Sequence, residues 1–336
     1  MTNPATDPLL DVRGLSVSFT RKGREDVHAV DGVSFSIQAG ETVGLVGESG
    51  SGKSVTSLAI MGLLPKRGVR VSGEVQFDGD DLLTLPTSRM RDIRGRDIAM
   101  IFQDPMSSLN PVVPIGVQVT EVLERHQDMK GAAAEAAAAD LLVQVGIPDP
   151  KRRLKEYPHQ LSGGMRQRAL IAMSLACKPQ LLIADEPTTA LDVTIQAQIL
   201  ELLRDLVRET GAALIMITHD LGVVAGLCDV VHVMYSGRVV ESAGRRELFA
   251  EPRHPYTGGL LASVPRLDSP RGAPLRPIPG SPTDLLAWSK GCAFAPRCSN
   301  RIAECTAGPP QLESLGGRSL RCFNPLPATV SDEVPA

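Results

Sequence analysis

The sequence is poor in aromatic residues, with one Trp, three Tyr and seven Phe among 336 residues. Such a chain offers few rings on which nucleic-acid bases could stack. It also lacks a basic excess, because 35 Lys and Arg residues stand against 38 Asp and Glu residues. Both absences argue against a protein that binds nucleic acid.

Long apolar runs are missing as well. No stretch reaches the roughly 20 residues that a membrane-spanning helix needs. Residues 1–8 show neither the basic start nor the apolar stretch of a signal peptide. We therefore expect a cytoplasmic chain whose association with a membrane depends on a partner. The length accommodates one large and one small domain.

Residues 47–54, Gly-Glu-Ser-Gly-Ser-Gly-Lys-Ser, fit the P-loop pattern. Glycines let backbone N–H groups turn toward phosphate oxygens, and the following helix adds the positive end of its dipole. A short apolar strand before the loop and a helix after it supply the expected context. The pattern predicts a nucleoside triphosphate held with Mg²⁺, through Gly47, Ser49, Gly50, Ser51, Gly52, Lys53 and Ser54.

Three other predicted buried strands end in polar residues, which are candidates for the chemistry of this site. Asp185 is suited to hold Mg²⁺, and the adjacent Glu186 is suited to act as a general base for water. Gln103 would ligate Mg²⁺ or hold the attacking water, or would simply start a loop. His219 would stabilise the transition state, or would cap the next helix. Strands that alternate with helices and end in ligand-binding residues predict a doubly wound α/β core.

Two further positions have both a structural and a functional interpretation. Ser162 is a good helix N-cap, and with Gly163 and Gly164 it forms a second helix start that could bind an anion. Phe19, at the end of a predicted edge strand, would either stack on an adenine ring or pack in a strand core.

The segment between Gln103 and Asp185 is predicted to be largely helical from residue 119 to residue 176. Its Ala-rich stretch at 131–142 has high helix propensity and little to pack with, so we expect a small surface helix. Residues 104–111 combine turn formers with Met106 and Leu109, which we expect to be exposed and to contact a membrane partner.

The last 74 residues hold 12 of the 26 prolines and four of the six cysteines. Such a segment is not expected to form a helix or a central strand. With little core of its own, it needs a disulfide or a bound metal to stabilise it. Disulfides are not expected in the cytoplasm. Zn²⁺ sites usually show tighter cysteine pairs, whereas iron–sulfur clusters accept looser spacing. The candidates are Cys292, Cys298, Cys305 and Cys322, near the basic residues Lys290, Arg297, Arg301, Arg318 and Arg321.

Together these motifs resemble the ATP-binding-cassette (ABC) ATPases over about residues 9–262. Met165 departs from the common pattern, which has Gln there in many members, but it leaves the residues assigned to ATP contact unchanged. The matching motifs are the Walker A loop (47–54), the Walker B strand with its glutamate (181–186), the signature (161–164), the Q-loop residue Gln103, the D-loop (Ala190, Leu191, Asp192) and the switch histidine His219.

The C-terminal tail indicates which subfamily of ABC ATPases the chain resembles. Residues 253–257, 260–265 and 277–280 resemble the C-terminal extension of oligopeptide and dipeptide importer ATPases, which nickel importers largely share. The resemblance implies an ATPase domain at 1–262, with an N-terminal antiparallel subdomain and a helical subdomain at about 104–176. It also implies an extension at 263–336 whose four cysteines hold a [4Fe–4S] cluster. The alternatives are Zn²⁺, and thiols that are unligated or form disulfides.

The function implied by the resemblance is Mg·ATP hydrolysis that drives uptake of di- and oligopeptides. Phe19 would then stack on adenine, and Asp192 would join the ATP contacts. The implied partners are a second ATPase subunit in a head-to-tail heterodimer, two permease subunits at the inner membrane and an extracytoplasmic peptide-binding protein. The alternatives are an importer of nickel or another small solute, and a soluble ABC ATPase acting on DNA or ribosomes.

Overall fold

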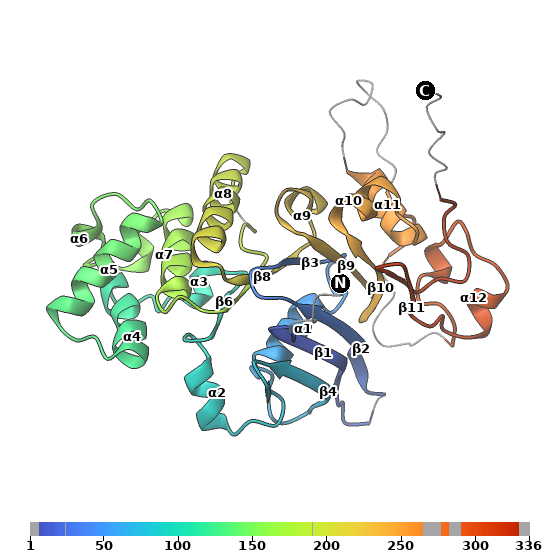
Figure 1. The fold of residues 1–336 in the computed structure, drawn as a ribbon, viewed down its shortest axis with the longest axis horizontal. Helices are drawn as coiled ribbons and strands as arrows, with labels where there is room; N and C mark the ends of the chain where they lie inside the picture. Colours follow the sequence, from blue (N-terminus) through green and yellow to red (C-terminus); the bar gives the residue numbers. More distant parts are fainter. Residues whose placement is uncertain (1–6, 24, 190, 265–276, 282–289, 329–336) are drawn as a thin grey trace, which may run out of the picture.

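The computed structural model describes residues 7–23, 25–189, 191–264, 277–281 and 290–328. Two sheets organise this part of the chain, and α1 lies between them (Figure 1). The helices outside this pair of sheets are mostly on the far side of the larger sheet. None of the helices in the described residues is both long and apolar enough to cross a membrane.

The smaller sheet is antiparallel, as expected for the N-terminal part. Its strands alternate buried and exposed residues, which is typical of a sheet with one face on a core. In spatial order the strands are β2 (Val27–Ile37), β1 (Leu10–Phe19), β4 (Val69–Phe77) and β5 (Asp80–Asp81).

The larger sheet is mixed, with a parallel central part. Strands β8 and β7 are buried along their whole length, because helices and the smaller sheet cover both faces of their apolar sequences. In spatial order the strands are β11 (Glu313–Leu315), β12 (Arg318–Leu320), β10 (Arg238–Gly244), β9 (Val230–Tyr235), β3 (Thr42–Val46), β8 (Ala213–Thr218), β7 (Leu181–Asp185) and β6 (Ile98–Ile101).

The helices occur mainly in connections between strands. The described ones are α1 (Lys53–Ile60), α2 (Thr87–Ile93), α3 (Pro105–Ser108), α4 (Ile115–Gln127), α5 (Ala132–Gln144), α6 (Pro150–Arg153), α7 (Gly163–Leu175), α8 (Val193–Thr210), α9 (Leu221–Leu227), α10 (Arg245–Ala250), α11 (Pro255–Ser263) and α12 (Glu304–Ala307), with 3₁₀ turns η1 (Pro158–Gln160) and η2 (Ala295–Arg297).

Helices α3 to α7 follow β6 and precede β7 in the sequence, and they form a helical group at one end of the larger sheet (Figure 1). The prediction that the Ala-rich helix has little to pack with is wrong. Ala138 and Leu142 of α5 are fully buried, because small alanine side chains let α5 lie close against α4 and α7. Leu109 is also buried, at 1% exposure, whereas Met106 is 57% exposed.

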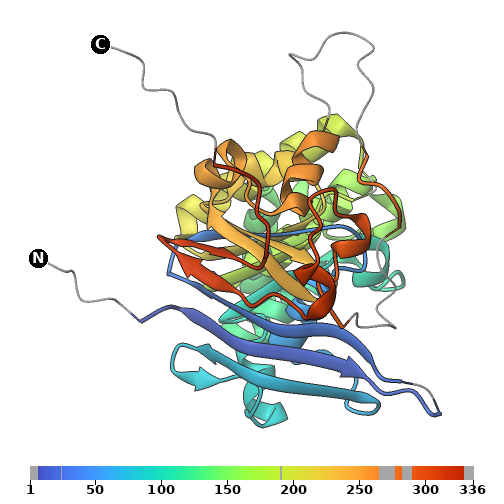
Figure 2. The same ribbon diagram turned by 90° about the vertical axis from the view of Figure 1, so that its right-hand side faces the viewer.

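The C-terminal extension is more regular than its proline content suggests. Strand β12 pairs with β10 on one side and β11 on the other, and α12 is a short helix, so the expectation that the tail forms neither a helix nor a central strand is wrong. No proline interrupts β12, so its N–H groups remain available for the ladder. Figure 2 shows this red segment beside the orange β9–β10 hairpin. Pro265 and the rest of 265–276 lie outside the described residues.

Candidate functional site

The P-loop connects β3 to α1, as the pattern predicts. Gly52 precedes the first helical residue with φ 101°, a conformation that favours glycine. A Cβ atom on Gly52 would collide with the carbonyl oxygen of Ala29, and one on Gly47 would collide with that of Met234. The neighbouring backbone therefore requires glycine at both ends of the loop.

Lys53 lies inside the curl of the P-loop, only 4% exposed. Its ammonium donates hydrogen bonds to the carbonyl oxygens of Gly47 at 2.8 Å and Glu48 at 3.0 Å. Burial lowers the pKa of Lys53, and the nearby carboxylates of Glu186, Asp185 and Glu48 oppose this fall. The ammonium is thus held inside the loop by the loop's own carbonyl oxygens.

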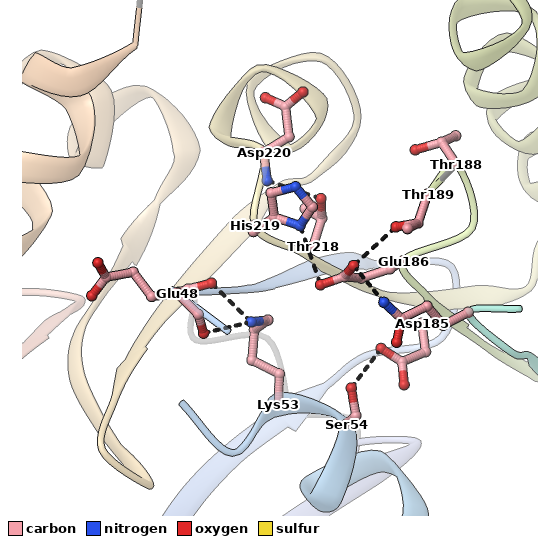
Figure 3. A network of polar contacts seen from close by, with 12 residues as sticks. Glu48, Lys53, Ser54, Asp185, Glu186, Thr188, Thr189, Thr218, His219 and Asp220 are labelled. Atoms are coloured by element: carbon pink, nitrogen blue, oxygen red, sulfur yellow. Dashed lines mark hydrogen bonds and ion pairs between the residues drawn. The ribbon is translucent and has the colours of Figure 1, made fainter. Parts of the chain in front are cut away.

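Ser54 and Asp185 join the P-loop helix to the end of β7. The Ser54 hydroxyl donates a hydrogen bond of 3.0 Å to Oδ1 of Asp185 (Figure 3). Burial raises the pKa of the Asp185 carboxyl, while the Ser54 hydrogen bond lowers it. A hydroxyl beside a carboxylate supplies the oxygen ligands that Mg²⁺ prefers.

Glu186 is the centre of the polar network in Figure 3. It accepts hydrogen bonds from Nε2 of Gln103 at 3.0 Å and from the Thr189 hydroxyl at 2.9 Å. Nδ1 of His219 lies 3.2 Å from its other carboxylate oxygen. Its φ of 46° is uncommon for a residue with a side chain, and such backbone strain concentrates at functional sites. The structure therefore brings Gln103, Glu186 and His219 together beside Lys53 and Ser54.

A cavity of about 770 Å³ opens over these groups. The P-loop, Gln103, Glu186 and His219 line one part of it. The other part is formed by residues that we did not predict for the site, and they belong to α11 and the C-terminal extension: Leu260, Ser263, Pro277, Ile278, Gly280 and Arg297.

The signature and D-loop residues lie elsewhere. Ser162 caps α7 by accepting a 3.3 Å hydrogen bond from the Met165 N–H, and Asp192 caps α8 in the same way through the Ile195 N–H at 3.0 Å. A Cβ atom on Gly164 would meet Ile195, so the starts of the two helices are adjacent. In the described chain, neither they nor Gly163 line the cavity, and Ala190 falls outside the described residues.

Phe19 also lies away from the cavity lining. It is the last residue of β1, pairs with Val27 and Val69, and packs against the core shared by the two sheets. Phe19 is therefore a half-buried core residue at the end of β1, and the prediction of an edge strand is wrong, because β1 pairs with β2 on one side and β4 on the other.

The four cysteines of the tail are free thiols that share one neighbourhood. The Cys292 N–H donates a 2.8 Å hydrogen bond to the Cys305 carbonyl oxygen. Burial raises the pKa of Cys322 to about 12, and charge on Cys292, Cys298 and Cys305 adds to this rise. Yet no group of three or more His, Cys, Asp or Glu side chains in the described chain is placed to hold a metal ion. The predicted metal site is not supported by this arrangement.

Two of the basic residues expected around the cysteines pair with carboxylates instead. Arg297 forms an ion pair with Glu48 of the P-loop at 2.6 Å. Arg318 lies 3.1 Å from Glu247 and 3.6 Å from the fully buried Glu241. The sequence resemblance marked the surrounding tail segments but gave Arg297 no role at the P-loop, since the contact joins residues 249 positions apart.

Comparisons with known proteins agree with this geometry. Residues 30–189 match the family model "ABC transporter", and residues 240–305 match "Oligopeptide/dipeptide transporter, C-terminal region". The oligopeptide transport ATP-binding protein OppD of Escherichia coli is 52% identical over 320 residues, covering 95% of this chain and 94% of OppD. The dipeptide transport ATP-binding protein DppD of Bacillus subtilis is 56% identical over 300 residues, covering 89% of each chain.

Solved structures give the same result for the fold. The dimeric ATP-binding cassette MJ0796, in a post-hydrolysis state bound to ADP and Pi, matches with a TM-score of 0.63 at 29% identity. The match covers 70% of this chain and 99% of that one. CbiO1 of Clostridium perfringens, part of the transporter complex cbiONQ, matches with a TM-score of 0.60 at 29% identity, over 73% of this chain and 92% of its own. The expected cassette fold is confirmed, and the chain belongs to the ABC transporter ATPases of the oligopeptide/dipeptide transport family.

Proposed function

We propose that this chain hydrolyses Mg·ATP to drive the uptake of di- and oligopeptides through partner membrane subunits. The observation that carries the proposal is the joint presence of the ATP site and the peptide-transporter extension in one chain. Curated relatives that are at least half identical over most of their length are named as oligopeptide or dipeptide transport ATP-binding proteins. The E. coli and B. subtilis names differ in peptide length, so we propose peptides as a class.

The network around Glu186 supports specific roles in hydrolysis. Lys53 would bind the phosphates, while Ser54, Asp185 and Gln103 would hold Mg²⁺. Glu186 would take the proton of the attacking water, and His219 would stabilise the charge that develops on the phosphate. Gln103 and His219 both contact Glu186, so the state of the phosphate site can act directly on both side chains.

The placement of the signature supports a two-chain site. Ser162, Gly163 and Gly164 form a helix start with exposed or half-buried residues, yet they do not line the cavity around their own P-loop within the described chain. We propose that they contact ATP bound by a partner ATPase, with Asp192 beside them and a related subunit as the partner. Adenine would stack on Phe19 at the rim of the smaller sheet.

The stretch between β6 and α4 supports docking to a membrane subunit. Apolar side chains are exposed along it and in the first turn of α4, at 38% for Phe102, 57% for Met106, 78% for Val112 and 53% for Val117. Clustered exposed apolar residues mark interaction surfaces. Because this stretch begins immediately beside Gln103, we propose that it carries the state of the ATP site to two permeases on the cytoplasmic face of the inner membrane. An extracytoplasmic binding protein would deliver the peptide.

We also propose that Cys292, Cys298, Cys305 and Cys322 hold a [4Fe–4S] cluster, with Zn²⁺ as the alternative. The proposal rests on the spacing of the cysteines and on the family resemblance, because the thiols as they lie in the described chain do not form a metal-binding group. A bound cluster would cross-link the loops of the extension. Anaerobic purification followed by iron, sulfide and zinc analysis tests the proposal. Zinc without iron would exclude the cluster, and a metal-free chain would exclude both.

Reconstitution tests the main proposal. The complex is purified from membranes through a tag on this chain, its partners are identified, and it is placed in liposomes with the binding protein. We expect ATP-dependent uptake of a labelled oligopeptide, and no uptake with Glu186→Gln. Uptake of Ni²⁺ instead of peptide would favour the small-solute alternative, and purification without permeases would favour a soluble ATPase.

A further inference from the structure

Arg297 of the C-terminal extension contacts the P-loop. Arg297, in η2, is 7% exposed and faces the Glu48 carboxylate with its guanidinium. Nη1 lies 2.6 Å from Oε2 of Glu48, and Nη2 lies 3.0 Å from Oε1. Nε donates a 2.9 Å hydrogen bond to the Pro279 carbonyl oxygen, which fixes the arginine within the extension. A bidentate pair of this kind is directional as well as strong.

Aromatic packing holds this contact in place. The Tyr256 hydroxyl accepts a 2.9 Å hydrogen bond from the Glu48 N–H, so both the backbone and the side chain of Glu48 are fixed. The Tyr256 ring lies 4.7 Å from that of Tyr235 and 5.3 Å from that of Phe294 in the extension. In a chain with so few aromatic residues, this cluster joins β9, α11 and the extension behind the P-loop.

Arg297 neutralises the negative charge of Glu48, which lies next to the predicted phosphate site. Glu48 belongs to the loop that would surround the phosphates, and its carboxylate acts electrostatically on Lys53. Figure 3 shows the Glu48 carboxylate directed away from the Lys53 ammonium. Released from Arg297, this carboxylate would repel the negatively charged phosphates and would be free to compete with them for Lys53.

We propose that Arg297 is a positioning residue of the ATP site, which neutralises Glu48 and holds its carboxylate away from the phosphates. The extension thereby becomes part of the nucleotide site and influences how tightly the site binds ATP relative to ADP. This inference rests on the proposed binding of Mg·ATP at the P-loop. Its consequence is specific: loss of Arg297 is harmful only while Glu48 carries a charge.

Equilibrium binding of fluorescent ATP and ADP analogues to the full chain tests the inference. We expect Arg297→Met to weaken ATP binding by about tenfold, and ADP binding by less, because ADP carries less charge. KM for ATP should rise while kcat changes little. Glu48→Gln, which leaves the arginine in place, should bind ATP at least as tightly as the wild type, and adding it to Arg297→Met should restore the affinity.

Arg301→Met is the matched control, since Arg301 is an exposed arginine of the same segment. It should bind ATP as the wild type does. If the double variant binds as weakly as Arg297→Met, or if ATP and ADP lose affinity equally, the arginine acts through packing and the inference is wrong. If Arg297→Met binds ATP with wild-type affinity, the inference about Arg297 is wrong, while the proposed function is unaffected. A wild-type chain that binds no Mg·ATP would overturn the proposed function as well.

Discussion

Nδ1 of His219 lies 3.2 Å from Oε1 of Glu186, and the two residues follow the neighbouring strands β8 and β7. The Glu186 side chain is 13% exposed, whereas that of His219 is 62% exposed. Gln103 and Thr189 both donate hydrogen bonds to Oε2 of this carboxylate, and the exposed imidazole lies beside Oε1. We expect both side chains to serve hydrolysis, and we expect the exposed His219 to contribute little to the stability of the fold.

Glu186→Gln should bind ATP but hydrolyse it at least about 100 times more slowly, because the amide cannot take the proton of the water. The amide keeps the shape of the carboxylate, so the contacts with Gln103 and Thr189 can be retained. Binding of a fluorescent ATP analogue and release of phosphate measure the two properties separately. Hydrolysis at the wild-type rate would show that another group is the base.

His219→Ala should lose most of its turnover, by about 100-fold, while keeping its affinity for ATP. The exposed imidazole contributes little to the fold, so the variant should unfold at nearly the wild-type temperature. His159→Ala, at an exposed histidine of η1, is the control and should be fully active. Near-normal turnover in folded His219→Ala would mean that the histidine serves only the local structure.

Lys53→Ala should abolish tight ATP binding. A hydrogen bond to a charged group contributes about 1.5–3 kcal/mol, which corresponds to a loss of roughly 10- to 100-fold in affinity. The exposed Lys151→Ala provides the control for removal of a lysine. Isothermal titration with Mg·ATP measures both variants, and equal affinities would remove Lys53 from the site.

The positions of site residues could be predicted from the sequence wherever a motif lies at the end of a buried strand. Ser54, Asp185, Glu186 and His219 each follow or adjoin an apolar segment whose strand type was evident, and parallel strands bring such ends together. Their proximity therefore followed from the order of the elements. The short strand β12 lacked this signal, since three residues are too few to show an alternating pattern.

Contacts across long sequence distances could not be predicted. The hydrogen bond between Glu48 and Tyr256 joins positions 208 apart, and nothing in either segment alone specifies the other. The burial of Ala138 could not be predicted either. Alanine has high helix propensity on any surface, so the composition predicted the helix but not its burial against α4 and α7.

Ser107→Cys should cross-link to a permease subunit in the assembled complex. Ser107 is exposed in α3, between the exposed Met106 and the buried Leu109. A thiol-reactive photocrosslinker on the purified complex, with the unsubstituted chain as background, measures the reaction. Ser72→Cys, exposed on β4 of the smaller sheet, should give no permease product. Failure of Ser107→Cys to reach any permease would argue against this docking surface.

Stability should fall as the pH drops from about 6.5 toward 3. Burial lowers the pKa of His254 to about 3, so the folded chain keeps this imidazole neutral while the unfolded chain protonates it near 6.5. The unfolded state then binds more protons, which favours unfolding at lower pH. In His254→Gln, the unfolding free energy should depend less steeply on pH. The slope against pH should fall by up to about 1.4 kcal/mol per pH unit.

Urea unfolding between pH 7 and pH 4.5 checks this prediction. His159→Gln should leave the slope unchanged, since His159 is exposed. His254→Gln is also expected to be less stable at neutral pH, because Nδ1 of His254 accepts a 3.0 Å hydrogen bond from the Tyr256 N–H. An unchanged slope in His254→Gln would mean that another buried group, such as His232, dominates the acid response.

Strand β12 has a consequence for the behaviour of the chain in solution. Without it, β10 would end the larger sheet with a row of unpaired N–H and C=O groups, which is a template for aggregation. With β12 in place the outermost strand is β11, which spans three residues, begins at Glu313 and follows Pro309 and Pro310. Short, charged edges flanked by proline resist pairing with other chains. By pairing with Glu241 and Ser242 of β10, the extension covers part of this edge, and we expect it to reduce self-association of the cassette.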